Sequence, residues 1–535
     1  MKWRQVTLSL ACTLGLIAGA YAQADTAPQI LRSGHSGDAD SLDPHLAWAG
    51  TAIIVVSDLF EGLLTLGADG RPVAGIAESW DVSADGLRYE FRLRKDLRWS
   101  DGTPLSSGDV VYSLRRLANP ATRASLGAAQ VKAIRNGGAI LSGDMPVESL
   151  GVSAPSPDRV VIELAHPTPY LLTVLALPAF APVPERAIRA HGIQWTQPGN
   201  LVSNGAFKLD RWIPQEKIVV ARNPHFHAVD SVALDQVQYY PLNNLNTGFA
   251  KFRAGELETM VNFPPERLDW LRENMPDSLH LSPSLGLYVY VPNHSRPPFD
   301  DVRVRRALSL VLDRAIITQR LIRTGDRPAY GVVPPNVSNY FPPLPDLEHN
   351  QSFDQRRQTA LQLLSEAGYS RTKPLRFELL YHTSEEHKKV AIAAASMWKQ
   401  IGVTVELVNS ERAVVDAAAK NGEFDLVRSA WFPPYADAYG FLNRFESGSP
   451  SNTSRYDNED YNQLVQRANQ ISDPQARAEL LRKAEQALVA DQAVIPIFYY
   501  VSRRLVSPRV RGWDDSNLTA LRPARYLSLA DEDKH

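Results

Sequence analysis

Cysteine is almost absent from this chain. Among its 535 residues only Cys12 is a cysteine, and it lies in an apolar stretch at the N-terminus. If that stretch is removed, the mature chain has no disulfide, no thiol nucleophile and no thiolate ligand for a metal. Its stability must then come from the burial of side chains in a core.

An excess of charge of either sign is absent too. The 57 basic residues are nearly balanced by 59 acidic ones, which gives a formal net charge of −2. Binding to nucleic acid depends on an excess of lysine and arginine. We therefore expect no nucleic-acid partner.

Familiar catalytic signatures are also missing. The chain contains no Gly-x-Ser-x-Gly elbow, no His-Glu-x-x-His pair and no phosphate-binding glycine loop. An enzyme, such as a secreted hydrolase, is therefore only a remote alternative. No cofactor is expected.

The first residues have the pattern of a secretion signal. Lys2 and Arg4 precede a largely apolar stretch, and Ala20-Tyr21-Ala22 offers the small residues that a signal peptidase requires. The apolar stretch is shorter than the roughly 20 residues that span a bilayer, and no later run reaches that length. We expect residues 1–22 to be cleaved off, with Ala24 as an alternative cleavage site, and the mature product to be soluble.

The length and the alternation of patterns predict several α/β lobes. A chain of 535 residues is too long for one core. Residues 89–94 alternate apolar and charged side chains like a half-buried strand, residues 106–116 read as a capped helix, and residues 301–322 read as one long helix. Such alternation favours mixed sheets covered by helices, with domain crossings near the proline-rich segments 182–198 and 283–298.

Several short segments in series carry a more specific signal. In chain order they are Leu42–His45, Asp58–Leu63, Ile76–Trp80, Tyr89–Arg94, Trp99–Pro104, Asp109–Ser113, Asn204–Phe207 and Phe299–Ala307. This series resembles the extracellular solute-binding proteins of peptide and nickel ABC importers, family 5. Three further segments, Pro328–Gly331, His382–Lys389 and Phe424–Arg428, look closest to the oligopeptide-binding branch of that family.

The resemblance implies a periplasmic binding protein of two lobes, class II type, with mixed sheets and the ligand enclosed between the lobes. Lobe I would be discontinuous (23–60, 186–285 and 503–535) with an extra subdomain at 61–185, and lobe II would span 286–502. It also implies a monomer that captures an oligopeptide or peptide-like ligand. The ligand would pass to the membrane permease subunits of an importer.

One position departs from the family pattern for holding the ligand's amine. The family has Trp-x-x-Asp, and here Trp431 is kept while Pro434 stands at the place of the aspartate. Proline has no charge and no side-chain acceptor. Either Asp437 takes over through a shifted loop, or the ligand lacks an ordinary free amine, as in a modified or N-blocked peptide or an opine-like conjugate.

The resemblance also suggests cations for the ligand's carboxylate. Arg428 and His387 match family positions, and Arg412 stands where the family has a pocket tryptophan. Arginine can bind a carboxylate with two parallel hydrogen bonds. The alternatives are an ion pair of Arg428 with Asp425 and a solvated Arg412.

Tyr112, Tyr288 and Asn262 align near residues that line the family's cleft. For each tyrosine, packing in a core is the competing interpretation. A receptor for a metal chelate is another alternative, because the family includes nickel binders and His225-x-His227 has suitable spacing. Two histidines are fewer than the three or four ligands of a metal site, so no metal ligand is assigned.

Overall fold

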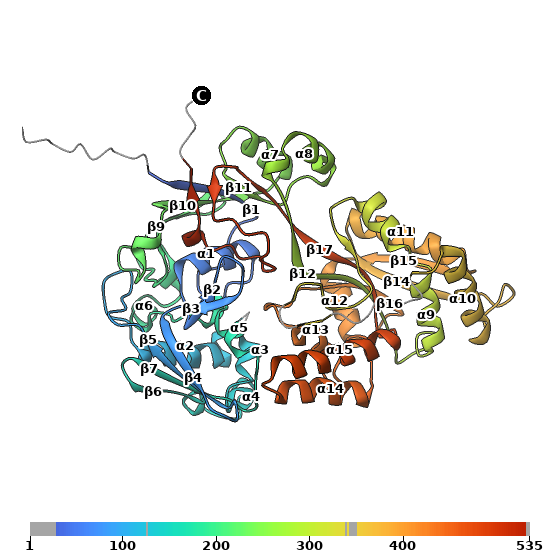
Figure 1. The fold of residues 1–535 in the computed structure, drawn as a ribbon, viewed down its shortest axis with the longest axis horizontal. Helices are drawn as coiled ribbons and strands as arrows, with labels where there is room; N and C mark the ends of the chain where they lie inside the picture. Colours follow the sequence, from blue (N-terminus) through green and yellow to red (C-terminus); the bar gives the residue numbers. More distant parts are fainter. Residues whose placement is uncertain (1–27, 125–126, 338–339, 342–349, 531–535) are drawn as a thin grey trace, which may run out of the picture.

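The structure is a computed structural model that describes residues 28–124, 127–337, 340–341 and 350–530. It has two lobes, each built from a mixed sheet and helices, which confirms the predicted α/β class (Figure 1). The predicted signal peptide, 1–22, lies outside the described residues. No helix in the described ranges has the length and apolar character needed to cross a membrane.

One sheet of eleven strands runs through both lobes. At its centre, β12 (Leu279–Pro292) and β17 (Ile495–Val506) pair antiparallel, with an irregular register between Pro283 and Leu287. On one side of this pair lie β11 (Thr259–Val261), β1 (Ile30–Ser36), β10 (Gln236–Leu242), β9 (Lys217–Arg222) and β8 (Phe207–Ile213). On the other side lie β16 (Leu426–Trp431), β14 (Arg376–His382) and β15 (Thr404–Ser410), while β13 (Arg327–Pro328) pairs with β17.

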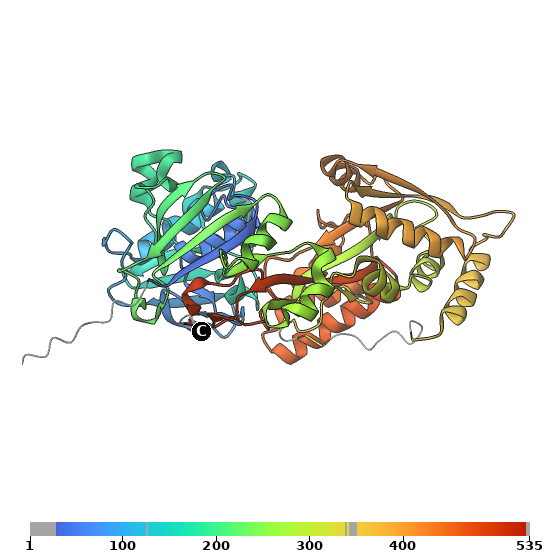
Figure 2. The same ribbon diagram turned by 90° about the horizontal axis from the view of Figure 1, so that it is seen from above.

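Viewed from above, the two lobes lie on either side of the crossing strands β12 and β17 (Figure 2). The predicted lobe boundaries at 285/286 and 502/503 fall inside these two strands. The proline-rich segment 283–298 overlaps β12, so the crossing there is an extended strand. The division into lobes at single residues stays a prediction.

In lobe II the helices cover both faces of the sheet. One face packs against α9 (Val302–Leu310), α10 (Phe353–Glu366) and α11 (Glu385–Lys399), and the other against α13 (Tyr439–Leu442), α14 (Glu459–Gln470) and α15 (Pro474–Ala490). Successive residues of a strand point to opposite faces. Leu426 of β16 accordingly packs on the α11 side, while Val427 and Trp431 pack on the α15 side.

The helix predicted for residues 301–322 is interrupted. The structure has α9 only to Leu310, followed by a turn and a wide helical turn over Ile316–Ile322. The buried guanidinium of Arg314 donates to the carbonyls of Ser309 and Leu312, at 3.1 and 3.2 Å. These carbonyls are thereby satisfied by a side chain, which allows the backbone to leave the helix.

The segment predicted as an extra subdomain has its own antiparallel sheet. The strands lie in the order β4 (Ala77–Val82), β5 (Arg88–Leu93), β7 (Arg159–Glu163) and β6 (Val152–Ser156), and α2 (Ser107–Ala118) packs on them. The strand predicted at 89–94 is confirmed as β5. The capped helix is confirmed as α2, whose first turn is closed by Ser106 and Asp109.

The remaining elements are shorter. The helices are α1 (Gly50–Leu59), α3 (Ala128–Val131), α4 (Gly137–Leu141), α5 (Leu171–Leu175), α6 (Glu185–His191), α7 (Leu245–Arg253), α8 (Leu268–Asn274) and α12 (Arg412–Asn421). Two small sheets pair β2 (Leu64–Leu66) with β3 (Pro72–Ala74), and β18 (Val510–Arg511) with β19 (Ser528–Leu529).

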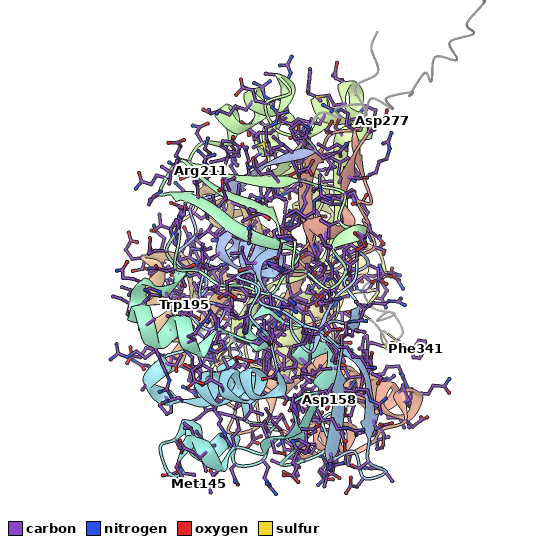
Figure 3. The ribbon with its side chains drawn as sticks, turned by 90° about the vertical axis from the view of Figure 1, so that its left-hand side faces the viewer. Met145, Asp158, Trp195, Arg211, Asp277 and Phe341 are labelled. Carbon is purple, nitrogen blue, oxygen red and sulfur yellow. The ribbon has the colours of Figure 1, made fainter. Side chains whose placement is uncertain are left out.

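A buried ion pair fixes the extra subdomain to lobe I. Arg116 of α2 donates to both carboxylate oxygens of Asp43, at 3.1 and 2.6 Å. Trp195, labelled in Figure 3, donates to the same carboxylate at 3.2 Å. Burial raises the pKa of the Asp43 carboxyl, but the hydrogen bonds and charge of Arg116, together with His45, leave the pKa below its usual value.

We predict that Asp43→Asn lowers the free energy of unfolding by about 3–5 kcal/mol at neutral pH, because Arg116 is left as a buried cation without its anion. Since folding lowers this pKa, the contribution of the pair is present above the ordinary pKa of 3.8 and is lost on further acidification. Urea denaturation measures both effects.

The exposed pair Glu185–Arg189 provides the control for this prediction, with side chains 37% and 77% exposed. Glu185→Gln is expected to cost less than about 1 kcal/mol. An equal cost for Asp43→Asn and Glu185→Gln would contradict the structural role of Asp43.

Candidate functional site

A cavity of about 600 Å³ lies between the lobes and is lined from both. Lobe I contributes residues of α1, the segments 177–179 and 518–521, and Asn262, the crossing strand β12 contributes Leu285, and lobe II contributes residues 432–434. Most of these side chains are apolar. No aspartate or glutamate of the described chain lines this cavity, so nothing there offers a charged partner to an ammonium group.

The ionisable groups of this interlobe cavity are His35 and Arg504. Burial, together with the nearby Arg504, lowers the pKa of His35 to about 3, so the imidazole is neutral at neutral pH. Burial and the neighbouring Arg522 lower the pKa of Arg504 to about 9. The interlobe cavity is therefore suited to apolar and anionic parts of a ligand.

Asn262 and Pro434, which the sequence relates to the ligand, both line the interlobe cavity. Asn262 follows β11 with a φ of 62°, and its backbone N–H donates to the carbonyl of Arg503 at 2.8 Å. This bond holds Asn262 against the crossing strand β17. Ligand binding by Asn262 stays a prediction. The residue itself lies at the wall of the interlobe cavity.

Arg428, His387 and Tyr288 come together in one buried cluster on lobe II. The Arg428 side chain donates to the Tyr500 hydroxyl at 2.8 Å, and its guanidinium lies 4.4 Å from the ring centre of Tyr288. The His387 ring packs edge-on against Tyr288, and its Nε2 lies 3.0 Å from Nε2 of His382. Burial, then Arg428 and His382, lower the pKa of His387 to about 3.

Arg428 forms no ion pair with any described carboxylate, and its Nε is buried without an acceptor. The alternative partner, Asp425, lies beside Arg296 at 3.6 Å. Arg428 is thus a cation whose guanidinium still has N–H groups able to donate to a ligand. Between it and the interlobe cavity lies Tyr500, whose ring packs on Phe432 with centres 5.1 Å apart.

Two charged residues near this cluster were missed by the sequence reasoning. Arg503 of β17 has two buried guanidinium nitrogens without partners. Burial raises the pKa of Glu386 on α11, and the nearby Arg503 and Arg428 oppose that rise. The available signal for Arg503 was the adjacent pair Arg503-Arg504 in the sequence, since neighbours in a strand point to opposite faces.

Trp431 lies away from the Arg428 cluster. It is three residues along β16 from Arg428, and the alternation of the strand places it on the opposite face of the sheet. Its ring packs on Phe445, and the guanidinium of Arg444 lies 4.9 Å from its centre. Its indole N–H is buried without an acceptor.

Asp437 has a different partner from the ligand amine proposed for it. Arg477 of α15 donates to both of its carboxylate oxygens, at 2.8 and 2.7 Å, and both side chains are largely buried. Asp437 does not line the interlobe cavity, nor does it line a second cavity whose wall includes Trp431. Its geometry is that of a structural ion pair, because Arg477 already satisfies the charge that a ligand ammonium would have to satisfy.

Arg412 and Tyr112 are not brought to the interlobe cavity. The Arg412 side chain is 79% exposed at the start of α12, with Asp416 at 3.6 Å, as in the solvated alternative. Tyr112 lines a separate pocket on α2 with Arg116 and Glu185. Tyr112 lies inside the family segment Asp109–Ser113, but that position did not indicate the direction of its side chain.

The histidine pair of the metal-chelate alternative is occupied otherwise. His227 lies 2.6 Å from Glu61, which also binds Arg525. Across the described ranges, no group of three or more histidine, cysteine or acidic side chains is placed to hold a metal ion.

The model of the bacterial extracellular solute-binding proteins, family 5 (Middle), matches residues 71–453. The chain is 39% identical over 509 residues to the periplasmic oligopeptide-binding protein of Escherichia coli (strain K12), covering 93% of each chain. It is 37% identical over 489 residues to a probable deoxycholate-binding periplasmic protein of the same strain, covering 91% of this chain and 90% of that one.

Among solved structures, the fold is similar to a periplasmic murein tripeptide-binding protein in its unliganded open form. The TM-score is 0.85 at 33% identity, and 95% of this chain and 99% of that chain are covered. The two-lobe arrangement implied by the short motifs is thereby confirmed. The chain belongs to family 5 of the bacterial extracellular solute-binding proteins.

Proposed function

We propose that this chain is the periplasmic substrate-binding component of an ABC importer, and that it captures oligopeptides or peptide-like ligands for the membrane permease. The observation that carries the proposal is the interlobe cavity, which both lobes line and the crossing strands span. A ligand that touches both lobes favours the arrangement in which they are closest, because its affinity for that arrangement is higher. The relative named as an oligopeptide-binding protein supports the ligand class.

The ligand's carboxylate is the charge that the site is best equipped to bind. Arg428 has a buried Nε without an acceptor, Arg503 has two such nitrogens, and Arg504 lies in the cavity wall. Charge-assisted hydrogen bonds from arginine to a carboxylate are about twice as strong as neutral ones. A peptide would therefore enter with its chain along the apolar cavity and its carboxylate toward the cations on β16 and β17.

A second candidate function is binding of an apolar carboxylate or an N-blocked peptide. The absence of acidic side chains around the interlobe cavity, within the described part of the chain, favours a ligand that has no free amine there. The relative named as a probable deoxycholate-binding protein, at 37% identity, supports a receptor of this fold for an apolar ligand.

We extend the proposal to the secretion, location and oligomeric state of the protein. Residues 1–22 act as a signal peptide and are removed, the mature protein acts in the periplasm as a monomer, and it binds without catalysing a reaction. Nucleic acid is not a partner, because the charge of the chain is balanced.

Native mass spectrometry of the purified mature protein tests the ligand class. We expect bound species of mixed mass that mild denaturation releases as short peptides. A single apolar carboxylate or N-blocked peptide would favour the second candidate instead. A bare protein that no peptide stabilises against heat would overturn the peptide proposal.

Replacing Arg428 by alanine is expected to weaken binding of a peptide with a free carboxylate by about 1.5–3 kcal/mol, the range for a hydrogen bond to a charged group. Isothermal titration calorimetry measures the loss. Arg412→Ala is the control, because that side chain is 79% exposed and should change the affinity little. Equal affinities of the Arg428→Ala variant and the native protein would remove Arg428 from the site.

For Asp437→Asn we expect a loss of about 3–5 kcal/mol in the free energy of unfolding, because the buried Arg477 loses its anion. Peptide affinity, measured at a temperature where the variant is folded, should change less than about threefold. The opposite result, full stability with weakened binding of peptides that have a free amine, would restore Asp437 to the ligand site.

A further inference from the structure

A second cavity lies next to the interlobe cavity, beyond the loop that follows β16. It has a volume of about 580 Å³ and shares residues 432–434 with the interlobe cavity as a common wall. Its other walls come from the segment 439–451 of lobe II and from Ala129 and Gln130 of lobe I. Figure 1 shows α3, which carries these two residues, on the side of lobe I that faces lobe II. The two cavities are therefore neighbours that share the loop 432–434 as a wall.

Glu446 is an acidic side chain in this second cavity with no cation beside it. Its side chain is half-buried, and no lysine, arginine or histidine of the described chain lies within ion-pair distance of it. Burial raises the pKa of its carboxyl to about 7, and the neighbouring Tyr439 side chain opposes that rise. Leaving a partly desolvated carboxylate without a counter-charge is energetically unfavourable. A bound cation would therefore lower the free energy of this site.

Arg444 is the converse case, a cation without an anion. Its guanidinium lies over the ring of Trp431, and its Nε is buried with no acceptor. Burial alone lowers its pKa to about 10, which leaves the side chain charged at neutral pH. Within the described ranges no carboxylate lies within 4.0 Å of it, Glu446 included, although the two residues are only two positions apart.

The nearby residues Asp437 and Arg477 show the contrast. They form a paired, largely buried ion pair with two short hydrogen bonds. Glu446 and Arg444, by comparison, line one cavity and leave each other unpaired. Two opposite charges held apart in this way match a ligand group that carries both charges.

We propose that the second cavity binds a zwitterionic group of the ligand, with Glu446 holding its ammonium and Arg444 holding its carboxylate. This inference rests on the proposed function and names the substrate class more closely. It also resolves the departure at Pro434. The acid that the loop lacks at this position is then supplied by Glu446, which lines the same cavity as Pro434.

Three peptides test the proposal on the native protein by titration calorimetry: Asp-Ala-Ala, Ala-Ala-Ala and N-acetyl-Asp-Ala-Ala. The first has an ammonium and a side-chain carboxylate on one residue, the second lacks that carboxylate, and the third lacks the ammonium. We expect Asp-Ala-Ala to bind about tenfold or more tightly than either of the others, as expected for losing one charge-assisted bond. This comparison needs no variant and is independent of folding defects.

The variants then assign each charge. Glu446→Gln should abolish the preference for the free amine over the acetylated peptide and keep the preference for Asp over Ala, while Arg444→Met should do the reverse. Glu423→Gln, an exposed acid on the same lobe, should change neither preference.

The outcomes separate the two levels of the proposal. If the native protein binds all three peptides with equal affinity, the zwitterion subsite is wrong while the peptide receptor stands. Preferences that survive both variants also overturn the subsite. If none of the three peptides binds, both the proposed function and the subsite fail.

Discussion

The pairing of β12 with β17 is the constraint on which the rest of this structure depends. The two strands are the central ladder of a sheet that enters both lobes, so they set the distance and direction between the lobes. Where their register breaks, Gly286 leaves room for other side chains. A Cβ at this position would lie 2.3 Å from the ring of Phe432 and 2.9 Å from Tyr500. Because Gly286 has no Cβ, Phe432 and Tyr500 can pack directly against the crossing strand β12.

The same strands also distribute the charges of the site. Tyr288 on β12 and Tyr500 on β17 hold Arg428 of the neighbouring β16, and the backbone of Arg503 holds Asn262. Because side chains alternate along a strand, Arg503 lies on the side of the Arg428 cluster, while Arg504 lies in the wall of the interlobe cavity. A ligand that contacts both arginines must therefore extend from one side of β17 to the other. This arrangement suits an extended molecule better than a compact one.

Patterns within a few residues of each other predicted the local elements well. The alternation in 89–94 became β5, and Ser106 with Asp109 became the cap of α2. The failures depended on distant partners. The helix at 301–322 is interrupted where the buried Arg314 donates to the carbonyl of Pro496, and Asp437 is paired with Arg477, forty residues away. Glu446 and Arg444 carry no sequence signal, because two oppositely charged neighbours normally suggest a pair with each other.

The Asp437–Arg477 pair has a consequence for movement between the lobes. It fixes the segment that carries Tyr435 and Tyr439, and Tyr170 of lobe I stacks on both rings, with centres 5.2 and 5.0 Å away. Tyr435 is itself buried in a core cluster built almost entirely from lobe I. Aromatic stacking is worth only about 0.5–1.5 kcal/mol beyond burial and is favourable with offset rings. The contacts that join the lobes thus differ in character: a strand ladder, a stack of rings and the exposed ion pair of Arg323 with Asp269. Rotation about the ladder would move the rings across one another beside the cavity that Glu446 and Arg444 line.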